Sequence, residues 1–491
     1  MGPLERFKQE LSRPDLIETL RAGLVGARAF IDGPAGRRKL LYADYVASGR
    51  GLRQIEDFVL NEILPFYANS HTEASYCGRF TTRLRESARQ EIGRLLGADA
   101  DTSVIFCGAG ATAGINKLVG LLDIERRIAA GEKIVVLVGP YEHHSNLLPW
   151  RESGASVIEI VEGEGGGPDI GDLEAALGQA AKADLLVGAF SAASNVTGIL
   201  TDTSRVTRLL KKHGAIAIWD YAGGAPYLPM AMSDGPDAAK DAIVFSPHKF
   251  PGGPGASGIL VLRNELIAVD RPTAPGGGSV RFVSPWGHDY SPSPVAREEA
   301  GTPNIIGDIR AALALLVKEA VGLTFIGKRD ASLRGRAIDR WRHNPFLEML
   351  TPLEGACLPI FSFRVRDGHG GYVHHQLFTR MLSDYCGIQA RGGCACAGPY
   401  AHRLLAIPKE ASIELSEAIR RGQELEKPGW IRLNFSYLLD DDEAELIIEG
   451  VDRLARSAGQ YVLLYECDDR TARFSPRGER DAGFGRRAEL G

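Results

Sequence analysis

The sequence has few of the features that would place a protein outside the cell or within a membrane. Cysteine occurs only seven times in 491 residues, mostly at isolated positions, unlike the dense pattern of a disulfide-stapled fold. No apolar run approaches the roughly 18–20 residues that a membrane-spanning helix needs. The N-terminal stretch is charged and lacks the apolar segment of a signal peptide. We therefore expect a cytoplasmic protein with no membrane partner.

No charge of one sign dominates the chain. Lys and Arg number 57 against 62 Asp and Glu, which gives a net charge of −5. A protein whose main partner is nucleic acid usually carries a strongly basic face, so we expect no nucleic-acid partner. Hydrophobic residues make up 44% of the chain and charged residues 24%, as in ordinary globular proteins.

Glycine is abundant, with 58 residues, and the glycines gather at the ends of apolar runs. Such runs predict seven strands, at residues 103–107, 133–138, 156–161, 184–191, 215–220, 241–246 and 258–263. Helix-like segments between several of them predict an α/β fold with a mostly parallel seven-stranded sheet covered on both faces. Sheets of this kind bind ligands at the carboxyl ends of their strands.

The texture of the sequence predicts four parts. We assign residues 1–39 to an N-terminal helical segment, 40–325 to a large α/β domain, 326–460 to a smaller C-terminal α+β domain and 461–491 to a mobile tail. Residues 272–303 are rich in Gly, Ser and Pro and predict a long loop, which at this length is functional or disordered.

A lysine directly follows one of the predicted strands. Lys249 ends the run Ser246-Pro247-His248-Lys249 and is followed by glycines. Burial at a strand end would lower the pKa of its ammonium, and a neutral amine can form a Schiff base; a solvated loop lysine is the alternative. Asp220 ends an earlier strand, where an aspartate can pair with the protonated pyridine nitrogen of pyridoxal phosphate (PLP). The pair favours a PLP site.

A glycine-rich turn opens the helix after the first predicted strand. In Gly108-Ala109-Gly110-Ala111-Thr112, backbone N–H groups and the helix dipole would face a bound phosphate. A dinucleotide fingerprint requires an acidic residue at the end of the next strand, but strand 133–138 runs into Gly139-Pro140-Tyr141. The turn therefore fits a single phosphate better, with a purely structural tight turn as the alternative.

Polar side chains also follow two other strands. His143 and His144 come after strand 133–138, where a histidine can stack on a planar cofactor. Metal binding by this pair is disfavoured, because no Cys or His partner lies at useful spacing. Asn195 follows strand 184–191, and its amide can hydrogen-bond a phenolic oxygen of a cofactor. Five strand ends with fitting polar groups form a stronger signal than any one of them.

These residues resemble the class V aminotransferase-like PLP enzymes of fold type I, and within them the cysteine desulfurase/selenocysteine lyase group. The match runs from about residue 40 to residue 456. The run ending at Lys249 matches S-x-H-K, in which the lysine bears PLP. The run 142–146 is similar to E-H-H-x-N, whose second histidine, here His144, stacks on the pyridine ring. Asn195 falls in S-N-V-x-G, and Asp220 matches the aspartate on the pyridine nitrogen.

The resemblance implies further cofactor contacts and a partner subunit. The positions that bind phosphate in the family are occupied by Ala111, Thr112, Ser246 and His248. Residues 299–304 match E-A-G-T-P-N, whose threonine, here Thr302, reaches the phosphate of the neighbouring subunit. The resemblance thus implies a homodimer with shared active sites, in the PLP-dependent transferase fold type I with a smaller C-terminal α+β domain.

The predicted small domain carries a segment that resembles R-x-G-x-x-C-A-x-P. By that register Cys396 is the nucleophile and Arg391 lines the site. Arg432 occupies the position of the arginine that clamps the substrate α-carboxylate, a role that suits the guanidinium fork. Three departures suggest a divergent branch: Gly223 replaces a usual Gln or His, Cys394-Ala395 replaces His-His before the cysteine, and the tail beyond Arg456 has no recognised counterpart in the family.

The resemblance implies removal of sulfur from L-cysteine through a Cys396 persulfide, giving alanine, with Lys249 removing the α-proton. A sulfur-acceptor protein would be a further partner. A class V aminotransferase, an epimerase or a C–S lyase would need Lys249 but no cysteine nucleophile, and a scaffold protein would need neither. Cys396 has three other interpretations: an unreactive residue, a metal ligand with Cys386 and Cys394, or a thiol that Cys394 resolves.

Overall fold

The computed structural model describes residues 2–70 and 72–478. The chain divides into two compact units. Unit 1 comprises the described residues of 1–23, 48–194 and 200–323, and unit 2 those of 24–47, 195–199 and 324–491. The border after residue 323 lies beside the predicted one at 325, whereas the predicted N-terminal segment 1–39 is shared between both units. Residues 195–199 belong to unit 2, although the residues before and after them in the chain belong to unit 1.

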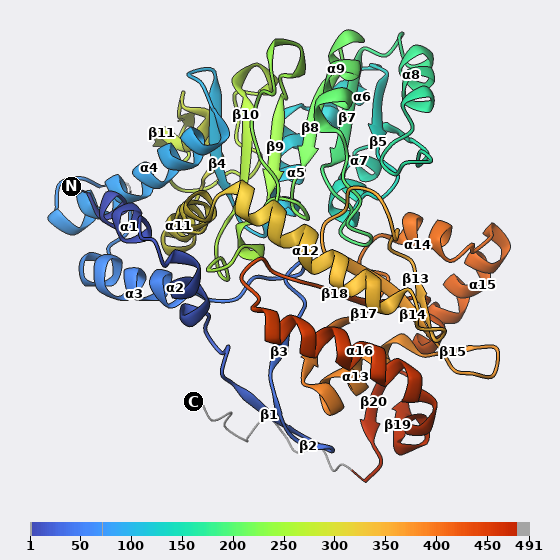
Figure 1. Cartoon of the computed structure of the whole chain (residues 1–491). Helices are drawn as coiled ribbons and strands as arrows, with labels where there is room; N and C mark the ends of the chain where they lie inside the picture. Colours follow the sequence, from blue (N-terminus) through green and yellow to red (C-terminus); the bar gives the residue numbers. More distant parts are fainter. Residues whose placement is uncertain (1, 71, 479–491) are drawn as a thin grey trace. The chain divides into compact units, whose positions relative to one another are not determined.

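Unit 1 contains the predicted seven-stranded sheet (Figure 1). Its strands are β4 (Thr102–Cys107), β5 (Ile134–Val138), β6 (Ser156–Glu159), β7 (Leu185–Ser191), β8 (Ile216–Asp220), β9 (Ala242–Phe245) and β10 (Gly258–Arg263). They lie in the order β4-β10-β9-β8-β7-β5-β6. Within this sheet β10 alone points opposite to the other six strands, and it pairs antiparallel with both β4 and β9. The predicted mostly parallel sheet is confirmed, because strands buried along their whole length, such as β5, appear in sequence as continuous apolar runs.

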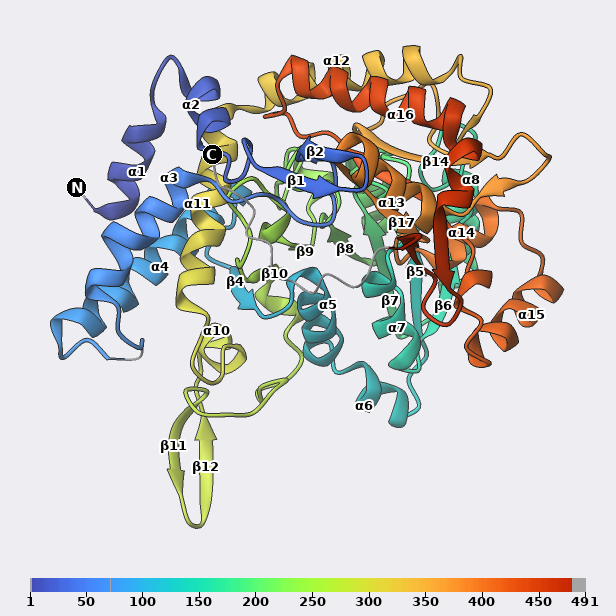
Figure 2. The same cartoon turned by 90° about the horizontal axis from the view of Figure 1, so that it is seen from below.

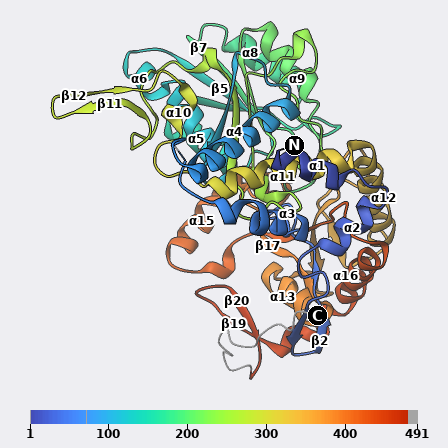
Figure 3. The same ribbon diagram turned by 90° about the vertical axis from the view of Figure 1, so that its left-hand side faces the viewer.

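Helices of unit 1 connect and cover these strands. They are α1 (Pro3–Leu11), α2 (Leu16–Gly23), α3 (Arg53–Phe58), α4 (Tyr76–Leu96), α5 (Gly110–Leu121), α6 (Ile124–Ala129), α7 (Leu148–Glu152), α8 (Ile170–Gln179), α9 (Thr203–Lys212), α10 (Pro294–Glu298) and α11 (Ile305–Val321). Figure 3 shows α11 beside α1 and α4, with which it packs. Helix α5 buries Ile115 and Leu118 against sheet residues that include Val244, which places its N-terminus at the carboxyl end of β4.

The prediction of a long loop at residues 272–303 is partly wrong, because this segment contains regular structure. Strands β11 (Val280–Ser284) and β12 (Gly287–Tyr290) pair as an antiparallel hairpin, followed by α10. Figure 2 shows the hairpin extending away from the sheet of unit 1. Its strands are short, and Phe282, Val283 and Trp286 are exposed. The buried/exposed alternation that signals a half-buried strand is therefore absent from the sequence.

Unit 2 is built on a mostly antiparallel sheet in the order β13-β14-β18-β17. The strands are β13 (Leu347–Met349), β14 (Ile360–Arg366), β17 (Arg391–Gly393) and β18 (Trp430–Asn434), and β15 (Tyr372–Val373) also pairs with β14. Its helices are α12 (Leu323–Trp341), α13 (His375–Cys386), α14 (Gly398–Leu404), α15 (Lys409–Arg420) and α16 (Asp441–Tyr461). The N-terminal part adds β1 (Phe30–Gly33), β2 (Gly36–Lys39) and β3 (Leu41–Tyr42), the last parallel to β16 (Ile388–Gln389).

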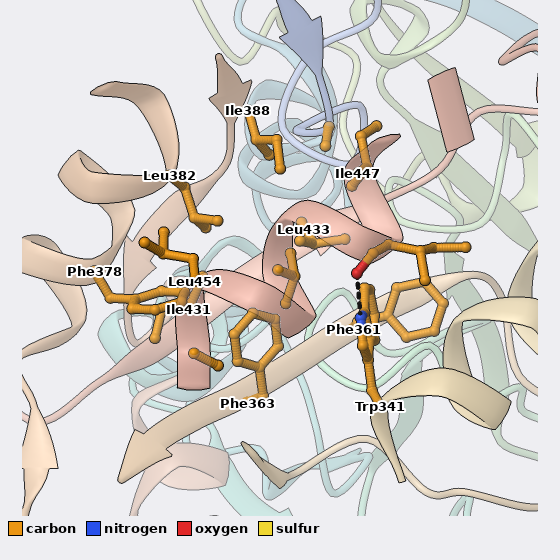
Figure 4. Packing of buried hydrophobic residues seen from close by; sticks show 14 of the residues in the cluster. Trp341, Phe361, Phe363, Phe378, Leu382, Ile388, Ile431, Leu433, Ile447 and Leu454 are labelled. Carbon is orange, nitrogen blue, oxygen red and sulfur yellow. Dashed lines mark hydrogen bonds between the residues drawn. The ribbon is translucent and has the colours of Figure 1, made fainter. Parts of the chain in front are cut away.

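An aromatic and aliphatic core holds unit 2 together. Figure 4 shows Trp341 of α12 against Phe361 and Phe363 of β14, with Leu433 of β18 nearby. The Trp341 indole N–H donates to the Ile448 carbonyl oxygen at 3.0 Å, so its one polar group is satisfied within the core. This packing fixes β18 and its neighbour β17, the strands that carry Arg432 and Arg391.

Part of the predicted tail is ordered into a hairpin. Strands β19 (Tyr465–Asp468) and β20 (Arg473–Pro476) pair antiparallel, and the buried Tyr465 hydroxyl donates to Asp384 at 2.8 Å. The rest of that tail, residues 479–491, lies outside the described residues. No helix in the described ranges is long and apolar enough to span a membrane.

Candidate functional site

Lys249 stands in a tight turn at the carboxyl end of β9. The turn is a 3₁₀ helix, Pro247–Lys249, in which Lys249 is half-buried. The chain then folds back so closely that a Cβ at Gly253 would lie 1.9 Å from the Pro247 carbonyl oxygen. A side chain is therefore excluded at Gly253, and this glycine is required for the turn that presents Lys249.

Four predicted phosphate-binding residues lie together at the N-terminus of α5. The Ala111 N–H donates to Ser246 Oγ at 2.9 Å. A Cβ at Gly110, which has φ +59°, would lie 2.7 Å from Ser246 Oγ and 3.1 Å from His248 Cε1. The Thr112 hydroxyl is 2.6 Å from Ser145 Oγ. The result is a small cradle of hydroxyls and N–H groups at the positive end of a helix dipole, a favourable place for an anion.

Burial keeps His248 neutral in this cradle. Desolvation, helped by the positive charge of Lys249, lowers the pKa of His248 to about 4. At neutral pH its imidazole therefore offers one N–H donor and one acceptor nitrogen. The same effect, with Arg151 as the nearby charge, lowers the pKa of half-buried His144. Thr112 and His144 line one cavity of unit 1, of about 1170 Å³.

Asp220 ends β8, the parallel neighbour of β9 in the sheet. Its side chain is 3% exposed. The Ala222 N–H donates to Oδ1 at 2.7 Å, and within residues 2–70 and 72–478 no group donates to Oδ2. Burial raises the pKa of Asp220, while the Ala222 N–H and the charge of Lys249 oppose that shift. A buried carboxylate oxygen in this position is suited to a cationic N–H donor.

Glu142 was not among the residues that sequence reasoning selected, although it begins the run that contains His144. It is 4% exposed and accepts hydrogen bonds from Ser191 N at 2.8 Å, Ser191 Oγ at 2.6 Å and Asn146 Nδ2 at 2.6 Å. Burial raises the pKa of Glu142 to about 7 despite these donors. Glu142 thus ties the His144 turn to the end of β7.

Thr302 lies in an exposed segment that a buried carboxylate anchors. The Glu299 carboxylate accepts from Arg85 at 2.6 Å, from Arg89 at 2.7 Å and 2.9 Å, and from Phe106 N at 2.8 Å. Burial acts to raise the pKa of Glu299, but these arginines lower it overall. Glu299 therefore fixes the start of the segment, and the contact of Thr302 with a neighbouring subunit stays a prediction.

In unit 2 the Asp44 carboxylate, which sequence reasoning did not select, binds both predicted arginines. Arg391 Nε donates to Asp44 Oδ2 at 3.1 Å, and Arg432 Nη2 lies 3.3 Å from Asp44 Oδ1. Arg432 is 4% exposed, and its Nη1 donates to the Asn195 carbonyl oxygen at 3.1 Å. Burial lowers the pKa of Arg432, whereas the charges of Asp44 and Cys396 act to raise it.

Asn195 and Cys396 also belong to unit 2. The Asn195 Nδ2 donates to the Ala395 carbonyl oxygen at 2.9 Å, and its Oδ1 is buried with no hydrogen-bond partner among the described residues. Cys396 is exposed and Cys394 is half-buried, and all seven cysteines are free thiols. The predicted contact of Asn195 with a cofactor oxygen stays a prediction, while its amide has a defined protein partner.

The metal interpretation of the cysteines finds no support in the part of the chain that the structure describes. No group of three or more His, Cys, Asp or Glu side chains there is placed to hold a metal ion. The Cys386 thiol instead lies 3.8 Å from the Gly450 carbonyl oxygen. Unit 1 thus gathers Lys249, Asp220, His144 and the phosphate cradle, and unit 2 gathers Asn195, Arg391, Arg432 and Cys396.

The chain is similar in sequence to named proteins. A probable cysteine desulfurase of Pyrococcus abyssi is 28% identical over 377 residues, which cover 75% of this chain and 87% of that protein. A probable cysteine desulfurase of Halalkalibacterium halodurans is 28% identical over 373 residues, with coverage of 75% and 87%.

Solved structures share the fold. A cysteine desulfurase from Thermococcus onnurineus NA1 superposes with a TM-score of 0.70 at 24% identity, covering 85% of this chain and 95% of that chain. The cysteine desulfurase CsdA of Escherichia coli gives a TM-score of 0.68 at 23% identity, with coverage of 90% and 98%. The predicted fold class is therefore confirmed. The model of the class-V aminotransferases matches residues 41–421, most of the chain, and the protein therefore belongs to the class-V aminotransferase family.

Proposed function

We propose that the protein is a PLP-dependent cysteine desulfurase that removes sulfur from L-cysteine and gives alanine. The observation that carries the proposal is the placement of Lys249 and Asp220 at the carboxyl ends of the adjacent parallel strands β9 and β8. Such strand ends are where open α/β sheets bind ligands. The names of the sequence relatives favour cysteine as the substrate over other amino acids.

The residues present fit PLP on three independent features. The cradle of Gly110, Ala111 and Ser246 has no room for a side chain at Gly110 and presents an anion site at a helix N-terminus. Asp220 is a buried residue whose Oδ1 accepts from Ala222 N–H, and its other carboxylate oxygen could accept from a protonated pyridine nitrogen. Lys249 supplies the amine. When bound, PLP supplies an electron sink for the carbanion formed at the substrate α-carbon.

The residues of unit 1 hold the cofactor and move the proton. Lys249 would hold the cofactor through its amine, and the free amine would take the substrate α-proton at Nζ. Asp220 would accept a hydrogen bond from the protonated ring nitrogen and so stabilise that protonated form. His144, neutral at pH 7 because burial lowers its pKa, offers a flat ring for stacking. Ser246, Thr112 and the Ala111 N–H hold the phosphate.

The residues of unit 2 bind the substrate and take its sulfur. Arg432 is the clamp for the substrate carboxylate, since its guanidinium is buried and its Nε has no partner among the described residues. The Cys396 thiolate attacks the substrate sulfur; a new S–S bond forms, the C–S bond breaks, and its electron pair stays with the carbon that becomes the alanine methyl group.

Variants that separate the two halves of this reaction test the proposal. Purified protein is incubated with L-cysteine, and alanine is quantified for wild type, Lys249→Ala, Cys396→Ala and Cys467→Ala. We expect alanine from wild type and Cys467→Ala, and none above background from the other two. Full alanine formation by Cys396→Ala would exclude the persulfide route and favour a C–S lyase. Turnover of other amino acids but not cysteine would favour a class V aminotransferase or an epimerase.

The assembly and the sulfur partner are further parts of the proposal. We infer a homodimer in which Thr302 reaches the phosphate of the neighbouring subunit, supported by the exposed position of Thr302 beside anchored Glu299. A protein that accepts sulfur would dock where Cys396 is exposed. A cytoplasmic location is consistent with seven free thiols. Sedimentation velocity of the holoenzyme tests the dimer, and a monomer would refute it.

A further inference from the structure

Cys394 and Cys396 stand at two positions of one tight turn. The Ala397 N–H donates to the Cys394 carbonyl oxygen at 3.2 Å, and the two residues between them, Ala395 and Cys396, both have φ +54°. Positive φ at both central residues is the pattern of a type I′ turn. Neither residue is a glycine, and the left-handed region is unfavourable for other L-residues. The turn therefore persists only because its surroundings hold it.

Contacts within unit 2 hold the turn. The Asn195 Nδ2 donates to the Ala395 carbonyl oxygen at 2.9 Å, and the Arg432 guanidinium holds the Asn195 backbone oxygen at 3.1 Å. On the other flank, Gly393 of β17 pairs with Trp430 of β18. The turn is therefore fixed on one side by strand β17 and on the other by the Asn195 side chain. The backbone of Asn195 is in turn bound by the buried Arg432.

The backbone places the two cysteines within reach of each other. By the mirror image of α-helical geometry, one residue in the left-handed conformation separates the Cα atoms of its neighbours by about 5.4 Å. Disulfide-bonded cysteines have Cα atoms about 4.4–6.8 Å apart. The remaining change is a rotation of the two side chains toward each other, which leaves the backbone of the turn as it is.

The surroundings of the turn also suit thiolate chemistry. Cys396 is exposed and Cys394 is half-buried. The Cys396 charge is close enough to oppose the lowering of the Arg432 pKa by burial. Arg391 lies three residues before Cys394, and its side chain is 54% exposed. Positive groups near a thiol favour the thiolate, which is the form that attacks disulfides and persulfides.

We propose that Cys394 is a resolving thiol that releases the sulfur carried by Cys396 as sulfide. This inference rests on the proposed function, which supplies the Cys396 persulfide. The Cys394 thiolate attacks Cys396 Sγ, a Cys394–Cys396 disulfide forms, and the outer sulfur leaves with the bonding electron pair as HS⁻, keeping its proton. The Cys394 sulfur is oxidised, the outer sulfur is reduced, and Cys396 Sγ keeps its oxidation state. A dithiol reductant must then reduce the disulfide before Cys396 can act again.

The test follows one turnover by mass spectrometry. Wild-type holoenzyme, Cys394→Ala and the control Cys467→Ala are mixed with less than one equivalent of L-cysteine and no other thiol. Alanine and sulfide are quantified, and the peptide that contains residues 394 and 396 is mapped. Wild type and control should give alanine, sulfide and a peptide lighter by two hydrogens, reversed by dithiothreitol. Cys394→Ala should give alanine without sulfide and a peptide heavier by one sulfur.

A second loading route separates this inference from the proposed function. Inorganic polysulfide can place a persulfide on Cys396 without any substrate turnover. If alanine never forms from cysteine but polysulfide still yields sulfide and the disulfide in wild type alone, the proposed function fails and the resolving role stands. If wild type keeps the persulfide as long as Cys394→Ala does by both routes, the resolving role is refuted, whatever the alanine yield.

Discussion

The side-chain amide of Asn195 donates a 2.9 Å hydrogen bond to the carbonyl oxygen of Ala395. This bond joins the segment that follows β7 to the residue between the two cysteines. It gives Asn195 a role in the protein itself, beside any contact with a cofactor. The amide holds a turn of two consecutive non-glycine residues with positive φ, and so controls how Cys396 is presented.

Replacing Asn195 should therefore change the chemistry of Cys396. In Asn195→Asp the donor becomes an acceptor facing the Ala395 carbonyl oxygen, and the repulsion should release the turn. In Asn195→Ala the bond is lost without repulsion, at a cost of about 1 kcal/mol. We expect the rate of Cys396 alkylation by iodoacetamide to differ from the wild-type rate in Asn195→Ala and to differ more strongly in Asn195→Asp. Equal alkylation rates in all three proteins would show that the bond does not hold the turn.

Asp220→Asn should have opposite effects on stability and activity. The substitution removes the charge of a buried carboxylate that has one oxygen without a donor in the described chain. The apo protein should gain about 1–3 kcal/mol in unfolding free energy, while alanine formation from cysteine falls. Urea unfolding of the cofactor-free protein and an alanine assay measure both. A loss of stability together with unchanged activity would place Asp220 outside the site.

Glu142 should make stability depend on pH. Its pKa is raised to about 7 by burial, so the folded protein holds a proton that the unfolded chain releases near pH 4.3. The contribution of Glu142 to the unfolding free energy is fully present below about pH 4.3 and is lost as the pH rises through about 7. In Glu142→Gln the decline in unfolding free energy between these values should be smaller, by about 4 kcal/mol at most. Parallel pH profiles for the two proteins would refute the shift.

Lys318 should make stability depend on pH in the direction opposite to Glu142. Its ammonium is buried and donates to the carbonyl oxygens of Ala225, at 2.6 Å, and Leu228, and burial lowers its pKa to about 7. The stability that accompanies its neutral form is present above the unfolded pKa, about 10.4, and is lost as the pH falls through about 7. Lys318→Met should flatten the profile between pH 7 and 10, whereas exposed Lys212→Met should not. An unchanged slope in Lys318→Met would contradict a neutral buried lysine.

The sheet and the strand-end residues were predictable because each signal is local. A buried parallel strand appears as a continuous apolar run; Asp220 ends such a run, and Lys249 and His144 lie four and six residues after the ends of β9 and β5. The hairpin at 280–290 was missed because its short strands expose their apolar side chains and lie among prolines and glycines.

The missed residues are those whose partners are distant in the chain. Asp44 binds Arg391 and Arg432, which lie 347 and 388 residues away, and no local pattern marks such a contact. Glu142 stood in a recognised motif, but its role depends on Ser191, which lies 49 residues later. The left-handed turn at Ala395 and Cys396 was also unpredictable, since neither residue type favours positive φ.

The most direct test of the account is to look for the sulfur on Cys396. Holoenzyme lacking the resolving thiol (Cys394→Ala) is treated with isotopically ³⁵S-labelled L-cysteine, and the label is mapped to peptides without reducing agent. The account predicts one thiol-labile sulfur on the peptide that contains Cys396, equal in amount to the alanine formed, and none when Lys249 is also replaced by alanine. Alanine or pyruvate formed with no label on Cys396 would contradict it.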